Sequence, residues 1–201
     1  MSRIIGVVQA ALMVVPVAAV SDVVGAKGSG VIVAPPSSVF PDATQGPDVI
    51  AFDERQDIRT PAAIPVDVDN GGLPISGGGQ LAPGVIPANA CIRSHYTHFD
   101  PDAVNRETAG FVFDADIVGI VVTQANLDAS AFLGAPGTAY PDAGVCGAGP
   151  TCGFEVGFAA GVPGADFFDA RNNGPRGQVR VDVEASAPAD NMRVITEGIC
   201  N

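Results

Sequence analysis

Short apolar segments separated by turn residues follow one another along most of the chain after residue 47. They cover residues 48–54, 63–69, 91–99, 110–116, 117–123, 154–161, 178–186 and 191–196. In the clearest segment, Val179, Val181 and Val183 alternate with charged residues, which is typical of a strand with one buried and one solvated face. Residues 117–123 are apolar on both faces, as in a strand that is covered on both sides. The spacing predicts an all-β domain, specifically a β-sandwich of jelly-roll-like type.

Helical periodicity is confined to residues 123–134. There Leu127 and Ala131 fall on one side, and Gly134 stands where a helix would end. The chain also contains 25 Gly and 17 Pro residues, and both types are unfavourable inside helices. We therefore expect at most one short helix.

The first 26 residues have the features of a secretory signal peptide. Arg3 precedes an uncharged, apolar stretch over residues 4–21, and small residues follow it. Residues 24–26 offer a cleavage site and residues 17–19 offer a second one; we expect cleavage after Ala26. The alternative is a membrane anchor, because an apolar run of roughly 18 residues is near the lower limit for spanning a bilayer.

The remaining chain divides by composition into two parts. Residues 27–47 are rich in Gly, Pro and Ser and are expected to form a loosely attached arm. Residues 48–201 are expected to form a single domain, since their length suits one hydrophobic core. We expect this mature protein to be secreted and to have no membrane span.

The charge of the chain limits its partners. The formal net charge is −12 at pH 7, and the basic residues are nine Arg and a single Lys. A surface with such an excess of negative charge repels nucleic acids and anionic lipids. No nucleic-acid partner is therefore expected.

Four cysteines in an exported chain predict two disulfides. Cys146 and Cys152 flank a short Gly/Pro loop and are expected to pair locally, which leaves Cys91 with Cys200. A zinc site made by the four thiolates is the competing interpretation, but the spacing contains no CxxC pair.

Two Phe-Asp-x-Asp stretches, at residues 99–102 and 113–116, are the main candidate for a metal site. Their carboxylates belong to Asp100, Asp102, Asp114 and Asp116. Calcium takes six to eight oxygen ligands, which two loops with alternate carboxylates and backbone carbonyls can supply. The alternative is that these are acidic turns, because Asp is favoured in turns where its side chain bonds to nearby backbone. We favour the turns and keep calcium as the second interpretation.

Other motifs are weaker. Residues 67–72 resemble the start of a calcium loop, but the twelfth position is Gly78 rather than Glu, so a β-turn is expected. His95 and His98 are three residues apart, and on a strand such residues point to opposite faces, which disfavours a shared metal. We interpret His95 as a structural, hydrogen-bonded histidine. The chain contains no GxSxG nucleophile motif.

Four stretches, "SHYTHFDP", "GFVFDADIVGIV", "LDASAFLGAPGTAYP" and "VDVEASAPADNMRVIT", occur in this order between about residues 92 and 196. Together they resemble a family of exported bacterial β-rich proteins of unknown function that often carry PEP-CTERM-type sorting tails. The resemblance implies export, a β-rich domain and a surface or matrix setting, and it assigns no catalytic residue. The final residues, "GICN", do not match such a tail, so we expect secretion rather than anchoring.

These observations favour a secreted, non-catalytic component of the cell surface or extracellular matrix, with extracellular polysaccharide or other surface proteins as partners. Two alternatives stay open: an extracellular hydrolase that uses Asp or Glu residues, and a module that binds a glycan or small ligand. The chain has no Trp and only two Tyr residues, so the aromatic platforms usual in sugar sites are scarce.

Overall fold

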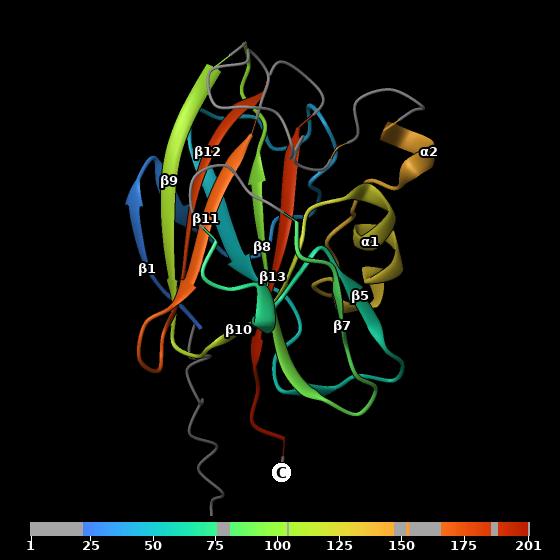
Figure 1. Cartoon of the computed structure of the whole chain (residues 1–201). Coiled ribbons are helices and arrows are strands. Elements are labelled where there is room, and N and C mark those ends of the chain that lie inside the picture. Colours follow the sequence, from blue (N-terminus) through green and yellow to red (C-terminus); the bar gives the residue numbers. More distant parts are fainter. Residues whose placement is uncertain are drawn as a thin grey trace, which may run out of the picture.

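The computed structural model describes residues 22–75, 81–103, 105–146, 152, 166–185 and 189–200. Strands dominate these residues (Figure 1). The strands are β1 (Val23–Gly28), β2 (Gly30–Ile32), β3 (Val49–Asp53), β4 (Ile58–Arg59), β5 (Ile64–Val66), β6 (Val68–Asp69), β7 (Gly84–Ile86), β8 (Cys91–Phe99), β9 (Asn105–Phe113), β10 (Ile117–Val121), β11 (Phe167–Asn172), β12 (Gly177–Ala185) and β13 (Asp190–Glu197). The helices are α1 (Gln124–Ala129) and α2 (Ala143–Cys146), with 3₁₀ turns η1 (Asn70–Gly72) and η2 (Ala131–Leu133).

Two sheets form the body of the protein. The four-stranded sheet has the order β1-β9-β12-β11 and is antiparallel throughout. The seven-stranded sheet has the order β2-β3-β8-β13-β10-β6, with β4 also paired to β8, and only the β2–β3 pair is parallel. In Figure 1 the four-stranded sheet lies at the left, and β8, β13 and β10 stand in the middle.

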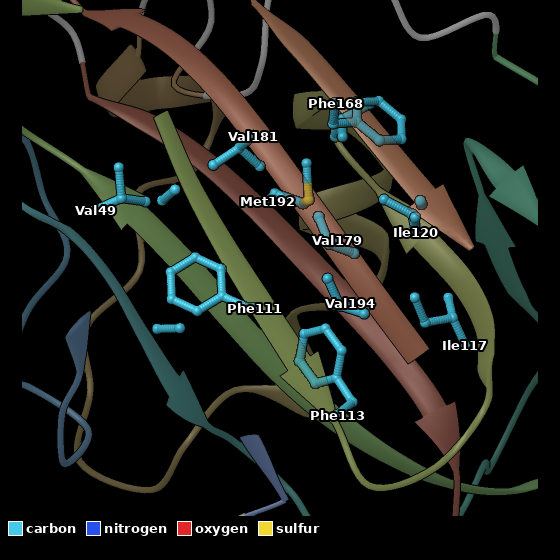
Figure 2. Packing of buried hydrophobic residues seen from close by; sticks show 14 of the residues in the cluster. Val49, Phe111, Phe113, Ile117, Ile120, Phe168, Val179, Val181, Met192 and Val194 are labelled. Carbon is cyan, nitrogen blue, oxygen red and sulfur yellow. The ribbon is translucent and has the colours of Figure 1, made fainter. Parts of the chain in front are cut away.

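The main hydrophobic core fills the space between these two sheets. It joins Phe111 and Phe113 of β9 and the valines of β12 to Met192 and Val194 of β13. Figure 2 shows these side chains between the ribbons of the two sheets. The alternating valines predicted from the sequence are the inner face of β12, and the prediction of an all-β sandwich is confirmed.

A second core covers the opposite face of the seven-stranded sheet. There β5 and β7 pair with each other, and together with α1 and η2 they bury Phe52, Tyr96 and Ile195. Figure 1 shows α1, β5 and β7 on this side, at the right. Strands β8 and β13 are therefore buried on both faces, so their polar side chains need partners inside the protein.

Most predicted strands are found close to their expected positions. Strand β8 has the predicted bounds, and β12 and β13 differ from prediction by one residue at each end. Strand β11 was not predicted, because its six residues carry an acidic and a basic side chain between short apolar positions. The predicted strand at residues 154–161 lies outside the described residues.

The expectation of at most one short helix needs correction. The predicted helical segment contains α1 and η2, with Gly134 at its end as expected. A second single-turn helix, α2, follows at Ala143–Cys146. The Asp142 carboxylate accepts hydrogen bonds from the backbone N–H groups of Gly144 and Val145, which stabilises this turn.

The N-terminal part of the described chain is an integral strand. Strand β1 pairs with β9 along its length, and Val23 belongs to the core between the sheets. The expected cleavage position after Ala26 falls inside β1. Part of the expected arm is likewise structured, since β2 pairs with β3. The site of cleavage stays a prediction.

The disulfide between Cys91 and Cys200 is formed, with an S–S distance of 2.03 Å, as predicted. Cys152 is also disulfide-bonded and fully buried. The side chain of its predicted partner, Cys146, lies outside the described ones, so the Cys146–Cys152 pair stays a prediction. Among the described residues, no helix has both the length and the hydropathy needed to cross a membrane.

Candidate binding groove

The four aspartates of the two Phe-Asp-x-Asp stretches are not brought together. Asp100 and Asp102 lie between β8 and β9, whereas Asp114 and Asp116 follow β9. The nine residues of β9 extend over roughly 26 Å, so the two pairs lie at opposite ends of the sandwich. No shared calcium site is formed from these four carboxylates.

Each pair makes contacts of its own. Asp100 accepts a hydrogen bond from the backbone N–H of Asp42 at 2.8 Å, and its burial raises the pKa of its carboxyl. Asp102 is exposed. Asp114 contacts Arg93, and the backbone oxygen of Asp116 accepts from the N–H of Glu197. None of these contacts joins an Asp side chain to the backbone of its own turn, so the interpretation of the two stretches as acidic turns stays a prediction.

No group of three or more His, Cys, Asp or Glu residues suited to a metal ion occurs in the described part of the chain. In the segment that resembles a calcium loop, Asp67 accepts hydrogen bonds from the backbone N–H groups of Val122 and Thr123, just before α1. Asp69 caps η1 by accepting from the N–H of Gly72. The segment is therefore a 3₁₀ turn next to a helix start rather than the expected β-turn.

The two histidines contact different residues. His98 Nδ1 lies 2.8 Å from Asn191 Oδ1, and burial lowers the pKa of the His98 imidazole to about 4. His95 Nδ1 lies 2.7 Å from Asp53 Oδ1, and His95 Nε2 lies 3.0 Å from Thr196 Oγ1. His95 is thus a structural, hydrogen-bonded histidine, as predicted.

The chain of Asp53, His95 and Thr196 has the same order of groups as a catalytic triad. However, the imidazole and the hydroxyl are fully buried, and the ring of Phe113 packs 4.8 Å from the imidazole. A nucleophile must reach its substrate. The three hydrogen-bonded side chains therefore link β3, β8 and β13 and are not a candidate active site.

A cluster of charges lies next to these three residues, around Arg93 of β8 and Asp22, which directly precedes β1. Arg93 Nη1 lies 3.0 Å from Asp22 and 3.2 Å from Asp114, and Arg93 Nε lies 2.8 Å from Asp57. Burial raises the pKa of Asp22 to about 6, against the opposing effect of Arg93. The hydrogen bond from Arg93 lowers the pKa of Asp57. The cluster attaches the start of β1 to the seven-stranded sheet.

A groove of about 680 Å³ crosses the outer face of the four-stranded sheet. This volume lies within the range of natural ligand sites. One row of paired residues that line the groove runs across the strands. In it, Lys27 of β1 pairs with Gly110 of β9, which pairs with Arg180 of β12. Arg180 in turn pairs with Asp169 of β11. Directly paired residues share one face of a sheet, so these four positions point outward together.

The neighbouring row adds a third cation. Val112 of β9 pairs with Gln178 of β12, which pairs with Arg171 of β11. The Nε and Nη2 atoms of Arg171 donate to Gln178 Oε1 at 3.1 and 2.9 Å. Because the amide is neutral, this contact holds the guanidinium in place without cancelling its charge.

The groove is cationic on an acidic protein. Its lining includes Lys27, Arg171 and Arg180 against a single carboxylate, that of Asp169. Arg180 Nη1 lies 3.9 Å from Asp169 Oδ2, and the two side chains are 62% and 41% exposed. Such an exposed ion pair contributes little to the stability of the fold. Lys27, Arg171 and Arg180 are all exposed, so the groove presents three cations and one carboxylate to a ligand.

Sequence reasoning did not identify this groove. The alternation of β12 showed that Arg180 faces solvent, but the partners of Arg180 come from strands far away in the sequence. Comparison with protein-family models, with curated protein sequences and with solved structures finds no match for this chain.

Proposed function

We propose that this protein is a secreted, non-catalytic component of the cell surface or extracellular matrix that binds an extended ligand in the groove of the four-stranded sheet. The observation that carries the proposal is the gathering of Lys27, Arg171 and Arg180 around one groove of a chain whose net charge is −12. Local charge of the opposite sign to the whole protein is a property of a recognition surface. The disulfide between Cys91 and Cys200 supports export, because such bonds persist in oxidising compartments.

The sheet gives this groove a rigid support. Its floor is made by β9 and β12, which form eight consecutive residue pairs, and the inner faces of both strands belong to the core. A rigid, preformed surface loses little conformational entropy when it binds a ligand. Binding without catalysis needs only a stable arrangement of charges. The groove therefore suits such binding.

Fractionation of cells that produce the protein tests this proposal. The expected result is that the protein is found in the washed matrix or surface fraction, and that Gly110→Val, which fills the groove floor, moves it into the medium. Retention of the folded protein inside the cells would overturn the proposal. So would equal retention of both proteins in the matrix, because the groove would then have no part in attachment.

One observation favours the second candidate, a hydrolase that uses carboxylates. Asp22, whose pKa is raised to about 6, lies in the same cluster as Asp114, and a carboxyl group with a raised pKa is typical of a general acid. In this cluster, however, both carboxylates contact Arg93. Release of reducing ends from a polysaccharide by the purified protein, lost in Asp22→Asn, would favour this function instead.

A further inference from the structure

The geometry points to a uronan, a polysaccharide with one carboxylate on each acidic sugar, as the ligand of the groove. This inference rests on the proposed function and specifies its ligand. It is carried by Lys27 and Arg180, which face each other across Gly110.

Gly110 leaves the space between the two cations open. A Cβ atom built at Gly110 would lie 3.8 Å from Lys27 Cβ and 3.8 Å from the backbone oxygen of Val179, so the site has room for a small side chain but holds none. An incoming carboxylate can therefore approach the backbone of β9 between the two cationic side chains. The spacing of two strands places the Cα atoms of Lys27 and Arg180 roughly 10 Å apart.

The negative charge of the whole protein favours anionic polymers of low charge density as ligands. Duplex DNA carries one charge per about 1.7 Å of its axis, and an extended acidic peptide carries one per about 3.3 Å. Polymers of such charge density experience strong repulsion from a protein with a net charge of −12. A polymer with one carboxylate per sugar ring has fewer charges outside the groove and can still place two of them at cations roughly 10 Å apart.

The groove also lies on the face of the sheet, where side chains rather than backbone groups are presented. A peptide that adds to a sheet bonds to the backbone at an edge strand, whereas β9 and β12 are the two inner strands of this sheet. Recognition here depends on charged and polar side chains, which suits the carboxylates and hydroxyls of a uronan. Each exposed ion pair is weak, so the affinity comes from several successive sugars.

Lys27 is the only lysine of the chain and provides a selective probe. Reductive methylation with ¹³C labels Lys27 and the terminal amine and keeps their charge. We expect the Lys27 methyl signal to shift on titration with polygalacturonate at low salt, to return when salt screens the contact, and to stay unchanged with neutral dextran. An unchanged Lys27 signal with polygalacturonate would overturn the inference.

Variants locate the binding in the groove. Lys27→Gln and Arg180→Gln are each expected to weaken polygalacturonate binding about twofold to fivefold. Gly110→Val keeps the net charge and is expected to weaken it about tenfold or more, because the branched side chain occupies the floor. The control is Arg176→Gln, which removes the same charge from an exposed turn outside the groove lining, and we expect less than a twofold effect. Equal losses in the three charge variants, with no loss in Gly110→Val, would mean general charge attraction and would contradict a site.

Other polymers decide between ligand classes. Polyglutamate that binds as tightly as polygalacturonate, with the same loss in Gly110→Val, would assign the groove to an acidic protein and overturn the uronan. Tighter binding of dextran sulfate would overturn it in favour of sulfated glycans. If polygalacturonate fails while the protein still needs Gly110 to stay in the matrix fraction, the inference falls and the proposed function stands. If the protein binds polygalacturonate but never reaches the matrix, the proposed function falls.

Discussion

The guanidinium of Arg193 meets the carboxylate of Glu54 at two points inside the protein, although the two residues lie 139 positions apart. The Nε–Oε2 distance is 2.7 Å and the Nη2–Oε1 distance is 2.9 Å, and the side chains are 1% and 0% exposed. The remaining nitrogen, Nη1, donates to the backbone oxygens of Leu127 and Ser130. Arg193 thus connects β13 to the segment after β3 and to the end of α1.

Removal of the negative partner in this pair should be costly. Glu54→Gln leaves the Arg193 cation buried without a counter-ion, which is expected to lower the free energy of unfolding by about 3 to 5 kcal/mol. Urea unfolding at pH 7 measures this change. The matched control is Glu184→Gln, whose carboxylate contacts Arg106 at the surface; this pair should contribute less than about 1 kcal/mol. Similar losses in the two variants would show that Glu54 and Arg193 are not a buried pair in solution.

The Asp22 carboxyl makes stability depend on pH. Its pKa is raised from 3.8 to about 6, first by burial and further by Asp114 and Asp53, while Arg93 and His95 act in the opposite direction. A folded-state pKa above the unfolded value means that the folded protein binds the extra proton, so this contribution is complete below pH 3.8 and is lost as pH rises through 6.

Comparison with Asp22→Asn isolates this contribution, because all other groups, including His98, titrate in both proteins. From pH 7 to pH 4 the parent protein should gain roughly 1 to 2 kcal/mol of stability relative to the variant. A pKa shift of one unit corresponds to about 1.4 kcal/mol, and partial screening by solvent reduces the contribution of Asp22. Chemical unfolding at several pH values measures the difference. A constant difference over this range would show that the Asp22 pKa is not raised.

The disulfide between Cys91 and Cys200 closes a loop with a sequence separation of 109. In the chain-entropy model a loop of this length contributes about 4 to 5 kcal/mol. The double variant Cys91→Ser and Cys200→Ser should therefore melt at a clearly lower temperature than the parent protein. Reductant should lower the melting temperature of the parent towards that of the variant. A non-reduced peptide that joins Cys91 to Cys146 or Cys152 would disprove this pairing in solution.

The structure changes the expected position of signal cleavage. The backbone N–H groups of Asp22 and Val23 donate to the Asp53 carboxylate at 3.1 and 3.3 Å, and Val23 is in the core. Cleavage after Ala26 would remove these contacts and most of β1. We therefore expect cleavage after Ala19, the second candidate site, and a mature chain that begins at Val20. Sequencing the N-terminus of secreted protein tests this expectation, and a start at Lys27 would contradict it.

Several features of this protein were determined by the sequence itself. The repeated short apolar segments predicted the all-β class, and the alternating valines of β12 predicted its inner face, because side chains of a strand point to its two faces in turn. The pairing of Cys91 with Cys200 followed once the short loop between the other two cysteines was considered. All of these features depend on local patterns or, for the disulfide, on the small number of ways in which four cysteines can pair.

Apart from the Cys91–Cys200 pair, only the tertiary structure decided which distant residues meet. The doubled Phe-Asp-x-Asp stretches look equivalent in sequence, but the extended strand β9 between them places them at opposite ends of the sandwich. Conversely, Lys27, Gly110 and Arg180 form one row because strand order brings β1, β9 and β12 side by side. Strand order depends on how two sheets bury their apolar faces against each other, a balance over the whole chain that no local pattern contains.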